Sequence, residues 1–502
     1  MKPTVDAVRA HLRAGDLRRA ERDARALLAA TTPQRPEHLY LLGVARLERG
    51  FAAEALDLFE RAVALAPTQP DLLEALALAR LRTGDADGAE REALLAGRMM
   101  PGRARPANLQ GLARLERGDI EGAIECFSRA AAIEQPNLEA AVNLALALNR
   151  GGDWKAAEDW ARLALAIDAK HAPAWINLGM SLKAQRRLDE AKDAFRRAGP
   201  DPRARFDLGY TLLLQGAIAD GLPLLESRKG PLGIGRGLTK KEWDGTPRPG
   251  KTLLVIHEQG MGDTILTCRF WPALTERFAR VVACVQPPLE RLLRESFPGI
   301  EIVASTDGVA YDTWCATMSL PFLLGVDSVD AIPRMPWIPV AGAARPDADA
   351  ARPLRVGLNW AGNPKFAFDR VRSTHLAELA LLLQAPGIEW VSLHRGHLEH
   401  EAEAAGLPQP LREATDFLDT ARVIAGLDLV VSTETAVPNL SAAMGVPTCV
   451  LASLDWDWRW AHWYANVRMC AQDEPGVWLG AVVRVLEALR DEMAKREAGA
   501  AA

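Results

Sequence analysis

The 502-residue sequence has no long apolar run, no clustered cysteines and no strong net charge. No stretch reaches the roughly 18 uninterrupted apolar residues that a membrane span needs, and the N-terminus is charged instead of holding an apolar secretory core. The six cysteines are far apart and form no C-x-x-C pair, which favours reduced core residues. The formal net charge of −5 provides no basic field for a nucleic acid. We therefore expect a cytoplasmic protein.

The sequence also lacks a P-loop, a Ser-His-Asp order and any nucleic-acid-binding motif. His394, His397 and His400 recur every three residues, but residues at that spacing do not all face one way on a helix, so we predict no metal site. With 49% hydrophobic and 25% charged residues, the composition is that of an ordinary globular protein. A chain of this length needs more than one core, and we expect about three domains.

The first part of the sequence repeats with a period of 34 residues. Glycines recur at positions 15, 50, 84, 118 and 152, and alanines at 20, 55, 89, 123, 157 and 191. A small residue inside each helix and a glycine at the turn are the signature of tetratricopeptide repeats, whose helix pairs bury their apolar faces only by stacking. A sixth copy has Arg186 at the glycine position, and a degenerate seventh spans roughly 203–226. We predict an α-helical solenoid over residues 1–228.

Solenoids of this kind present a groove that binds an extended peptide or helix of a partner protein. Asn143 and Asn177 lie one period apart on the first helices of their repeats. An Asn side chain pairs with a peptide backbone through both a donor and an acceptor, which makes these two residues candidate groove contacts. The alternatives are polar helix-surface positions and, for the whole array, a scaffold that only dimerises or rigidifies the chain.

Residues 229–251 are rich in Gly and Pro and lack a helical period, so we predict a linker there. Beyond it, short β-rich runs alternate with amphipathic segments, the pattern of parallel βαβ units. A Pro-rich passage, "AIPRMPWIPVAGAARPDADAARP", interrupts this alternation. We predict two doubly wound, Rossmann-like domains, 252–345 and 346–490, with a tail at 491–502. Strands are expected at 252–257, 281–285, 300–304, 355–362, 388–396, 427–435 and 447–453.

Ligands of doubly wound domains bind at the carboxyl ends of the strands, so the residues that follow the strands are the candidates. After the first strand comes "HEQGMGDTI", where Gly260 and Gly262 allow close approach of a ligand and Asp263 either faces it or caps a helix. After a later strand, Ser432 to Thr435 precede a helix N-terminus and form either an anion site or a plain cap.

The stretch "NWAGNPKFAFDRVRS" follows the strand that opens the second half. Lys365 is the only lysine between Thr252 and Ala494, where the chain otherwise uses arginine. A lysine in this setting suggests a compact point charge for a phosphate or sugar oxygen, and Arg370 extends the polar cluster. A solvated loop is the alternative.

Four motifs follow the repeats in this order: "EQGMGDTI", "NWAGNPK...DRVRS", "DFLDTARVIAGLDLVVSTETAVPNLSAAMGVP" and "DWRW". Together they resemble the repeat-fused glycosyltransferases of bacteria, whose catalytic half has the GT-B fold and is similar to the ADP-heptosyltransferases. The resemblance implies a metal-independent glycosyltransferase that uses no cofactor besides a nucleotide-sugar donor and modifies Ser or Thr of a protein held by the repeats. Repeat-fused relatives with this architecture resemble the flagellin-modifying transferases of motile bacteria. The resemblance therefore implies flagellin as the acceptor and a CMP-linked nonulosonic acid as the donor.

The resemblance also assigns residues. Asp263 matches the proposed general base, in an acceptor-side loop formed by Gly260, Met261 and Gly262. The donor-binding residues that it implies, which hold and stabilise the leaving phosphate, are Lys365, Arg370, Thr433, Glu434, Thr435 and Asn439.

Two positions depart from the family pattern. The family commonly has Asp-Thr-Ala followed by Ala-His-Leu at the donor turn, whereas this chain has Glu434-Thr435-Ala436 and Pro438-Asn439-Leu440. Asn439 cannot carry a positive charge as histidine can, so either the donor sugar differs or the site is weakened. A non-catalytic adaptor and a lipopolysaccharide core sugar transferase are the alternative functions.

Overall fold

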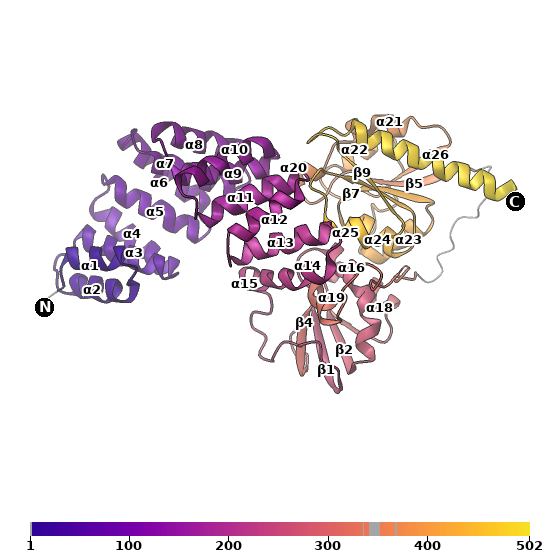
Figure 1. Ribbon diagram of the computed structural model, residues 1–502, viewed down its shortest axis with the longest axis horizontal. Coiled ribbons are helices and arrows are strands. Elements are labelled where there is room, and N and C mark those ends of the chain that lie inside the picture. The colour runs from indigo at the N-terminus through magenta and orange to yellow at the C-terminus, as the bar shows by residue number, and fades with distance from the viewer. Residues whose placement is uncertain (1–2, 335, 341–351, 367–368, 502) are drawn as a thin grey trace. The chain divides into compact units, whose positions relative to one another are not determined.

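The computed structural model describes residues 3–334, 336–340, 352–366 and 369–501, and it divides into two compact units, Met1–Leu178 and Gly179–Ala502. Figure 1 labels their helices and strands. Within the described residues no helix is both long and apolar enough to cross a membrane. The boundary predicted at 345/346 lies outside the described residues.

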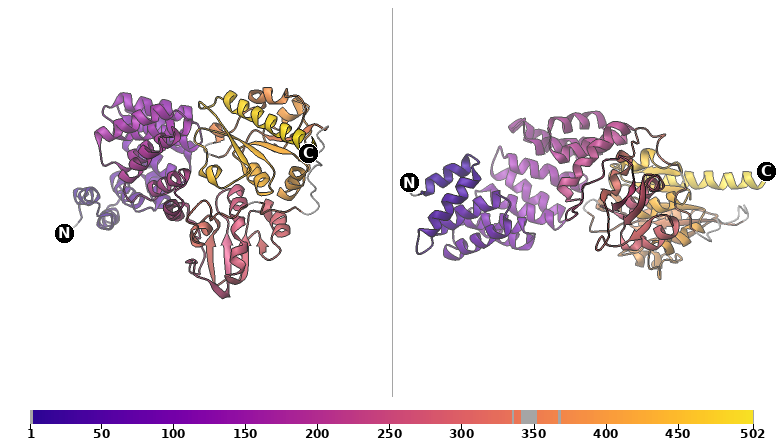
Figure 2. Two further views of the ribbon diagram at one scale, coloured as in Figure 1. Left: turned by 45° about the vertical axis from the view of Figure 1, so that its right-hand side comes forward. Right: turned by 90° about the horizontal axis from the view of Figure 1, so that it is seen from below.

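The first unit consists of helices that pack in consecutive pairs (Figures 1 and 2). Its helices are α1 (Val5–Arg13), α2 (Leu17–Ala29), α3 (Pro36–Glu48), α4 (Ala52–Leu65), α5 (Pro70–Arg82), α6 (Ala86–Met99), α7 (Ala104–Glu116), α8 (Ile120–Ile133), α9 (Leu138–Gly151) and α10 (Trp154–Ile167). The boundary between the two units falls within α11 (Ala172–Ala184). In the second unit, α12 (Leu188–Arg197), α13 (Pro202–Leu214) and α14 (Ile218–Leu225) again pack in consecutive order.

The repeated residues have the structural roles that the period predicts. The turn glycines at 50, 84, 118 and 152 all have positive φ, a conformation that favours glycine. The repeated alanines are fully buried, because a larger side chain would separate the paired helices. A Cβ on Gly43 or Gly111 would come within 2.5 Å of the rings of Phe59 or Phe127, respectively, so these glycines admit an aromatic ring from the second helix of the repeat.

The second unit begins inside the repeat array. Leu213 and Leu214 of α13 and Ile218 of α14 belong to the same hydrophobic core as Leu253 and Ile265 of the first α/β domain. The last repeat helices therefore fold as part of the α/β unit, although their sequence pattern is that of the repeats.

The predicted linker is a packed segment. Residues 229–251 include helix α15 (Lys229–Leu232) and the start of the first strand, and the Trp243 side chain is 2% exposed. The backbone N–H of Trp243 donates to the carbonyl of Trp314 at 2.7 Å, and its ring packs edge-on against Phe278. Gly and Pro remove the helical period here, but a buried tryptophan holds the segment on the sheet.

Two parallel sheets form the α/β part. The first has the order β3-β2-β1-β4, and the second β6-β5-β7-β8-β9. Their strands are β1 (Arg248–Ile256), β2 (Phe278–Cys284), β3 (Glu301–Val303), β4 (Thr313–Ala316), β5 (Leu354–Asn359), β6 (Ile388–Ser392), β7 (Leu429–Thr433), β8 (Thr448–Ala452) and β9 (Val467–Ala471). The predicted fold class, a tetratricopeptide solenoid followed by two parallel α/β domains, is confirmed.

The connecting helices include α16 (Met261–Thr267) after β1 and α24 (Ala436–Ala443) after β7. The others are α17 (Pro272–Thr275), α18 (Glu290–Ser296), α19 (Leu320–Leu323), α20 (Asp369–Arg372), α21 (Ala380–Leu383), α22 (Glu399–Ala404), α23 (Phe417–Ala425) and α25 (Trp458–His462).

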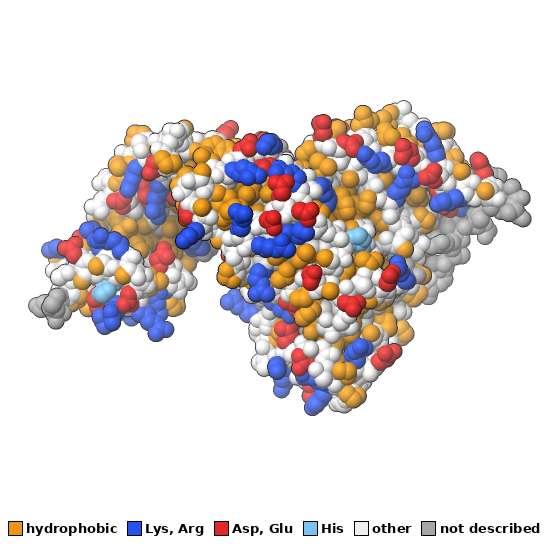
Figure 3. All heavy atoms as spheres, viewed as in Figure 1, with side chains coloured by type: hydrophobic (Ala, Val, Ile, Leu, Met, Phe, Trp, Pro, Cys, Tyr) orange, Lys and Arg blue, Asp and Glu red, His pale blue; other side chains and the backbone are white. Residues whose placement is uncertain are grey.

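The predicted C-terminal tail is helical. Helix α26 runs from Leu479 to Ala501, and Figure 2 shows it extending beyond the second sheet. Val482, Val485 and Leu489 are buried in the core of that sheet, and Met493 packs against it. The apolar face of the helix continues past residue 490, which is why the predicted boundary falls inside it. On the face in Figure 3, acidic and basic side chains are interspersed.

Candidate functional site

Two turns that follow strands meet in the second unit. The turn after β1 leads into α16, the turn after β7 leads into α24, and these two helices pack against each other. A Cβ on Gly262 would lie 2.9 Å from Nδ2 of Asn439 and 3.8 Å from the Cα of Ala436. The loop predicted to face the acceptor and the turn predicted to bind the donor (the donor turn), 177 residues apart between Gly262 and Asn439, are therefore in direct contact.

Asp263 lies at the start of α16 and is 5% exposed. One carboxylate oxygen, Oδ2, accepts a hydrogen bond from the backbone N–H of Gly260 at 2.8 Å. The other forms an ion pair with Nη1 of Arg459. Both sequence-based readings of this residue thus have a structural counterpart, since Asp263 caps its helix and also faces a charged partner.

Arg459 lies between two carboxylates. Its Nε and Nη2 donate to Asp457 at 2.8 and 2.6 Å, and its Nη1 faces Asp263. Burial raises the pKa of Asp263, against the effect of Arg459. Burial also opposes ionisation of Asp457, but there Arg459 outweighs it and lowers the pKa. Of the two acids, Asp263 is therefore the one that binds a proton more readily.

The backbone is strained beside this cluster. Among the described residues, the non-glycine residues with positive φ are Gln259, at 54°, and Arg186, at 60°. Gln259 directly precedes the N-cap Gly260 of α16. Strained backbone tends to persist where a site requires it.

The donor turn after β7 is built on buried hydroxyls. Nδ2 of Asn359, at the end of β5, donates to Oγ of Ser432 at 3.0 Å and to Oγ1 of Thr435 at 3.2 Å. The side chain of the N-cap residue Thr435 makes no capping hydrogen bond, so the N–H groups in the first turn of α24 have no acceptor from it. The Thr433 hydroxyl is buried and has no hydrogen-bond partner within the described residues.

β5 and β7 mark the point where the strand order of the second sheet reverses, because β6 lies on one side of β5 and β7 on the other. Open parallel sheets bind ligands outside the carboxyl ends of the strands at such a point. Asn359 pairs in register with Ser432 there. The hydroxyls of the donor turn thus lie where this fold class places a ligand.

Glu434 holds the loop that follows β8. Its Oε1 accepts hydrogen bonds from the backbone N–H of Asp457 at 3.0 Å and from the indole N–H of Trp460 at 3.1 Å. Burial raises the pKa of Glu434 to about 7. The longer carboxylate arm of Glu434 therefore reaches the "DWDWRW" loop and fixes it.

Asn439 does not point a free amide into the site. It is 4% exposed, its Nδ2 donates to the carbonyl of Thr435 at 2.8 Å, and its Oδ1 accepts from the hydroxyl of Tyr464 at 2.6 Å. These bonds use its donor and acceptor inside the protein. The structure thus places it as a buttress between α24 and Tyr464 and not as a direct donor-binding group.

Lys365 is exposed and has no ion-pair partner among the described residues. Its loop is anchored by Arg372, whose guanidinium lies 4.3 Å from the Phe366 ring centroid and whose Nη1 donates to the carbonyl of Glu434 at 2.8 Å. The lysine therefore sits on a loop tied to the donor turn. The side chain of Arg370 lies outside the part of the chain that is described.

The two candidate groove asparagines differ. Asn143 is half-buried. Asn177 is 3% exposed, and its Nδ2 donates to the carbonyl of Val142 at 2.9 Å. Its amide links α11 to α9, so this position joins helices and is not available to a bound peptide.

Sequence reasoning missed the contribution of the last repeats. Helix α13 packs against α25, and the hydroxyl of Tyr210 helps to lower the pKa of Asp457 as a hydrogen-bond partner. Lys183 donates to both oxygens of Asp455 at 3.0 Å. The four tryptophans in "LDWDWRWAHWY" were the available signal, because aromatic rings at that density need a packing partner.

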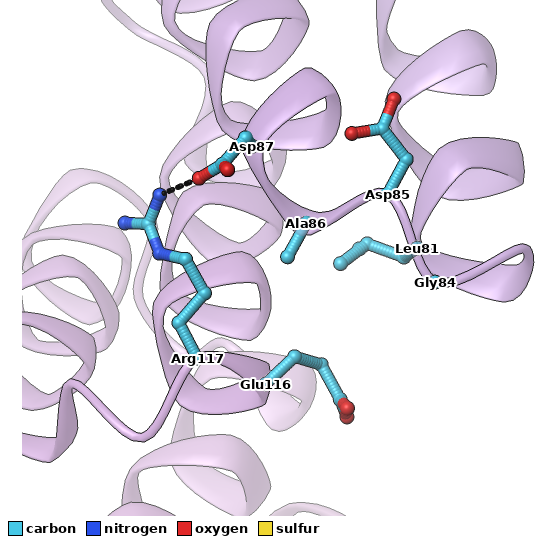
Figure 4. Close-up of a pocket in the computed structure, with 7 residues that line it drawn as sticks. All are labelled: Leu81, Gly84, Asp85, Ala86, Asp87, Glu116 and Arg117. Atoms are coloured by element: carbon cyan, nitrogen blue, oxygen red, sulfur yellow. Dashed lines mark hydrogen bonds and ion pairs between the residues drawn. The ribbon is translucent and has the colours of Figure 1, made fainter.

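A pocket of about 280 Å³ lies in the first unit, between neighbouring repeats. It is lined by Leu81, Gly84, Asp85, Ala86, Asp87, Glu116 and Arg117. Figure 4 shows the ion pair that crosses part of it, from Arg117 to Asp87 at 2.6 Å. None of the sequence-predicted site residues lines this pocket.

His394, His397 and His400 do not form a cluster of metal ligands. His394 is buried, and its Nδ1 is 3.1 Å from Oδ1 of Asn359. Within the described residues there is no group of three or more His, Cys, Asp or Glu side chains that could hold a metal ion.

Comparison with known proteins identifies the repeats. The tetratricopeptide repeat model matches residues 5–70, 108–172 and 176–233. The N-terminal part carries tetratricopeptide repeats. These tetratricopeptide repeats include α13 and α14, which fold with the second unit.

The chain is also similar to Protein FlbA of Caulobacter vibrioides, with 26% identity over 337 residues. The match covers 57% of this chain and about half (55%) of that relative.

Among solved structures, the Cut9–Hcn1 heterotetramer of the APC/C is 18% identical over 45% of this chain and 46% of that chain, with a TM-score of 0.42. A thermophilic tetratricopeptide protein of Thermus thermophilus is 22% identical over 36% of this chain and 99% of its own, with a TM-score of 0.33.

Proposed function

We propose that the chain is a metal-independent protein O-glycosyltransferase. In this proposal the repeats recruit a protein acceptor, the two α/β domains bind a nucleotide sugar, and the sugar passes to a Ser or Thr hydroxyl. Flagellin is the proposed acceptor and a CMP-linked nonulosonic acid the proposed donor, both from the family resemblance of the four motifs.

The observation that carries the proposal is the difference between the two acids on Arg459. A sugar transfer to a hydroxyl needs a group that takes the hydroxyl proton as the oxygen attacks the anomeric carbon. Burial raises the pKa of Asp263, whereas Arg459 lowers that of Asp457. When neighbouring groups have their pKa values pushed apart, the environment assigns them different roles. We assign Asp263 as the general base and Asp457 as the group that positions Arg459.

The leaving nucleotide phosphate would be stabilised by the donor turn. The first turn of α24 offers N–H groups and the positive end of a helix dipole, and no side chain caps it. The buried Thr433 hydroxyl offers a further donor, and Lys365 a positive charge. This set of groups supplies the electrostatic stabilisation for which other transferases use a divalent cation.

The tetratricopeptide repeats support a protein acceptor. Such repeats bind segments of partner proteins, and half-buried Asn143 remains a candidate contact on α9. The identity of the acceptor rests on the resemblance alone.

The test is the intact mass of flagellin from the source bacterium with and without this gene. We expect the deletion strain to produce flagellin lacking the mass of its sugar residues, and a plasmid copy to restore that mass. An Asp263→Asn plasmid copy should not restore it. Flagellin of identical mass in all strains would refute the flagellin assignment.

A non-catalytic adaptor is the second candidate, and the internal bonding of the donor turn favours it. Asn439 and Glu434 both use their polar atoms within the protein. An adaptor would bind the nucleotide sugar and the partner without turnover. Retention of radiolabelled nucleotide sugar on the protein, with no label transferred and none hydrolysed, would distinguish it from the enzyme.

A further inference from the structure

Arg186 occupies a backbone position that the other repeats give to glycine. It lies 34 residues after Gly152, and its φ is 60°, close to the values of 86°, 80° and 86° at Gly84, Gly118 and Gly152. A side chain in this left-handed region is strained, whereas glycine is not. Arg186 therefore occupies a turn position whose backbone conformation favours glycine.

The environment of the Arg186 side chain adds two further costs. Burial lowers the pKa of Arg186, so its charged form is disfavoured there. Its Nη2 atom is buried without a hydrogen-bond partner, and the side chain donates to no acceptor within the described residues. The nearby carboxylate of Asp455 accepts from Lys183 and not from Arg186.

One contact holds the Arg186 side chain in place. Its guanidinium lies 3.8 Å from the ring centroid of Trp456. Stacking on an aromatic face uses none of the in-plane N–H groups of a guanidinium, and Nε and Nη1 of Arg186, unlike Nη2, are not buried, so they can bind an oxyanion. The stacking therefore orients the donors without using them.

The position of Trp456 connects Arg186 to the donor turn. The next residue, Asp457, donates its backbone N–H to Glu434 at 3.0 Å and binds Arg459, the partner of Asp263. The carboxylates of Asp455 and Glu434 lie near enough to act electrostatically on Arg186. The unpaired cation is thus held beside the site that the proposed function uses.

We propose that Arg186, stacked on Trp456, is a binding site for an oxyanion of the substrate, either a carboxylate or a phosphate. The sixth tetratricopeptide repeat thereby supplies a specificity residue to the transferase site. This inference rests on the proposed function for the substrate class, namely an acidic nucleotide sugar, but the anion site itself is testable without turnover.

The test compares the full-length protein with Arg186→Gly by titration calorimetry. There are three probes. Inorganic pyrophosphate carries phosphate groups alone, CMP carries a phosphate on a nucleoside, and CMP-N-acetylneuraminic acid carries a phosphate and a sugar carboxylate. Loss of a charge-assisted contact should weaken binding by roughly tenfold to a hundredfold. Glycine relieves the backbone strain, so thermal stability should be unchanged or higher.

A charge-matched control distinguishes binding at Arg186 from the effect of the protein's overall charge on anion binding. Gly118 has the same turn position and a φ of 80°, and nothing lies within 4 Å of a Cβ built there. The double variant Arg186→Gly/Gly118→Arg keeps the net charge of the chain and restores a strained arginine at an equivalent turn. We expect it to bind the probes as weakly as Arg186→Gly does.

The probes also distinguish the sources of the anion. Weaker binding of pyrophosphate and CMP to Arg186→Gly assigns the site to phosphate. A loss confined to CMP-N-acetylneuraminic acid assigns it to the carboxylate. Equal binding of all probes to both proteins, no binding of any probe to either, or a large fall in thermal stability of Arg186→Gly would overturn the inference.

The proposed function can fail separately. If the wild-type protein modifies no acceptor and Arg186→Gly still loses pyrophosphate binding, the transferase assignment fails and the anion site stands. If transfer is observed and Arg186→Gly binds and turns over normally, the anion site fails and the transferase stands.

Discussion

The buried ion pair between Arg228 and Glu258 should fasten the end of the repeats to the first α/β domain. Arg228 and Glu258 are 4% and 5% exposed. Nε and Nη2 of Arg228 donate to the two Glu258 oxygens at 2.7 and 2.6 Å, and Nη1 donates to the carbonyl of Leu225 at 2.9 Å. Glu258 also accepts the backbone N–H of Met318 at 2.9 Å. The pair therefore joins the segment after α14 to the ends of β1 and β4.

Arg228→Met would leave the Glu258 carboxylate buried with one backbone donor. Removing one partner of a buried pair costs about 3–5 kcal/mol of unfolding free energy, because the remaining charge stays desolvated. Arg228→Met/Glu258→Gln removes both charges and keeps an acceptor for Met318, so we expect it to recover about 2 kcal/mol of that loss. The two changes should thus be strongly non-additive.

Urea unfolding followed by tryptophan fluorescence measures these free energies, since eleven of the 14 tryptophans lie beyond Gly179. Arg280→Met is the matched control, because its pair with Glu301 at 2.7 Å is exposed. It should cost less than about 1 kcal/mol. If Arg228→Met is as mild as Arg280→Met, or if the double variant loses the sum of the two single losses, the pair does not fasten these elements.

Three further variants address the site. Asp263→Asn should lower turnover about a hundredfold to ten-thousandfold, measured as sugar transfer per enzyme, while donor affinity in calorimetry stays the same; near-normal turnover would place the base elsewhere. Lys365→Ala should weaken nucleotide-sugar binding roughly tenfold or more with unchanged thermal stability, and unchanged affinity would remove this exposed lysine from the site. Burial raises the pKa of Glu434 from 4.5 to about 7, so the carboxyl stabilises the fold fully below pH 4.5 and this contribution is lost as pH rises to 7. Glu434→Gln lacks this titration, and its melting temperature relative to wild type should be higher at pH 8 than at pH 5; the same difference at both pH values would contradict the shift.

The repeats were predictable because their signals are local. A turn glycine with positive φ and an alanine at a helix crossing each report a constraint set by neighbours within one repeat. The division between the two units was not predictable in this way. It depends on Leu213 and Ile218 joining the core of the first sheet, a long-range contact that leaves no mark in the period.

The strands that sequence reasoning missed are β4 and β9. β4 is four residues long, and the second of the five residues of β9 is Arg468. In a short run, or in one that a charged residue interrupts, the alternation of apolar and polar residues that marks a strand is hard to recognise. Both lie at the edge of their sheet, where one side of a strand is unpaired.

The turns that form the site were predicted, whereas most of their internal bonding was not. Residues after β1 and β7 are marked by glycines and hydroxyls in the sequence itself. The partner of Asp263 is Arg459, 196 residues further along the chain, and the partner of Asn439 is Tyr464. Which polar residues bind a ligand and which hold one another is decided by these pairings, and one sequence does not contain them.

The ion pairs of Arg459 determine which groups of the site can accept a proton and which can bind a phosphate. Its Nε and Nη2 face Asp457, and its Nη1 faces Asp263. Since its donors are directed at these two carboxylates, the cluster carries one negative charge more than positive charge and favours accepting a proton over binding a phosphate. Positive charge for a leaving phosphate must then come from groups outside this cluster, among them the uncapped first turn of α24 and Lys365. This separation is why Asp263→Asn should act on turnover and Lys365→Ala on donor affinity.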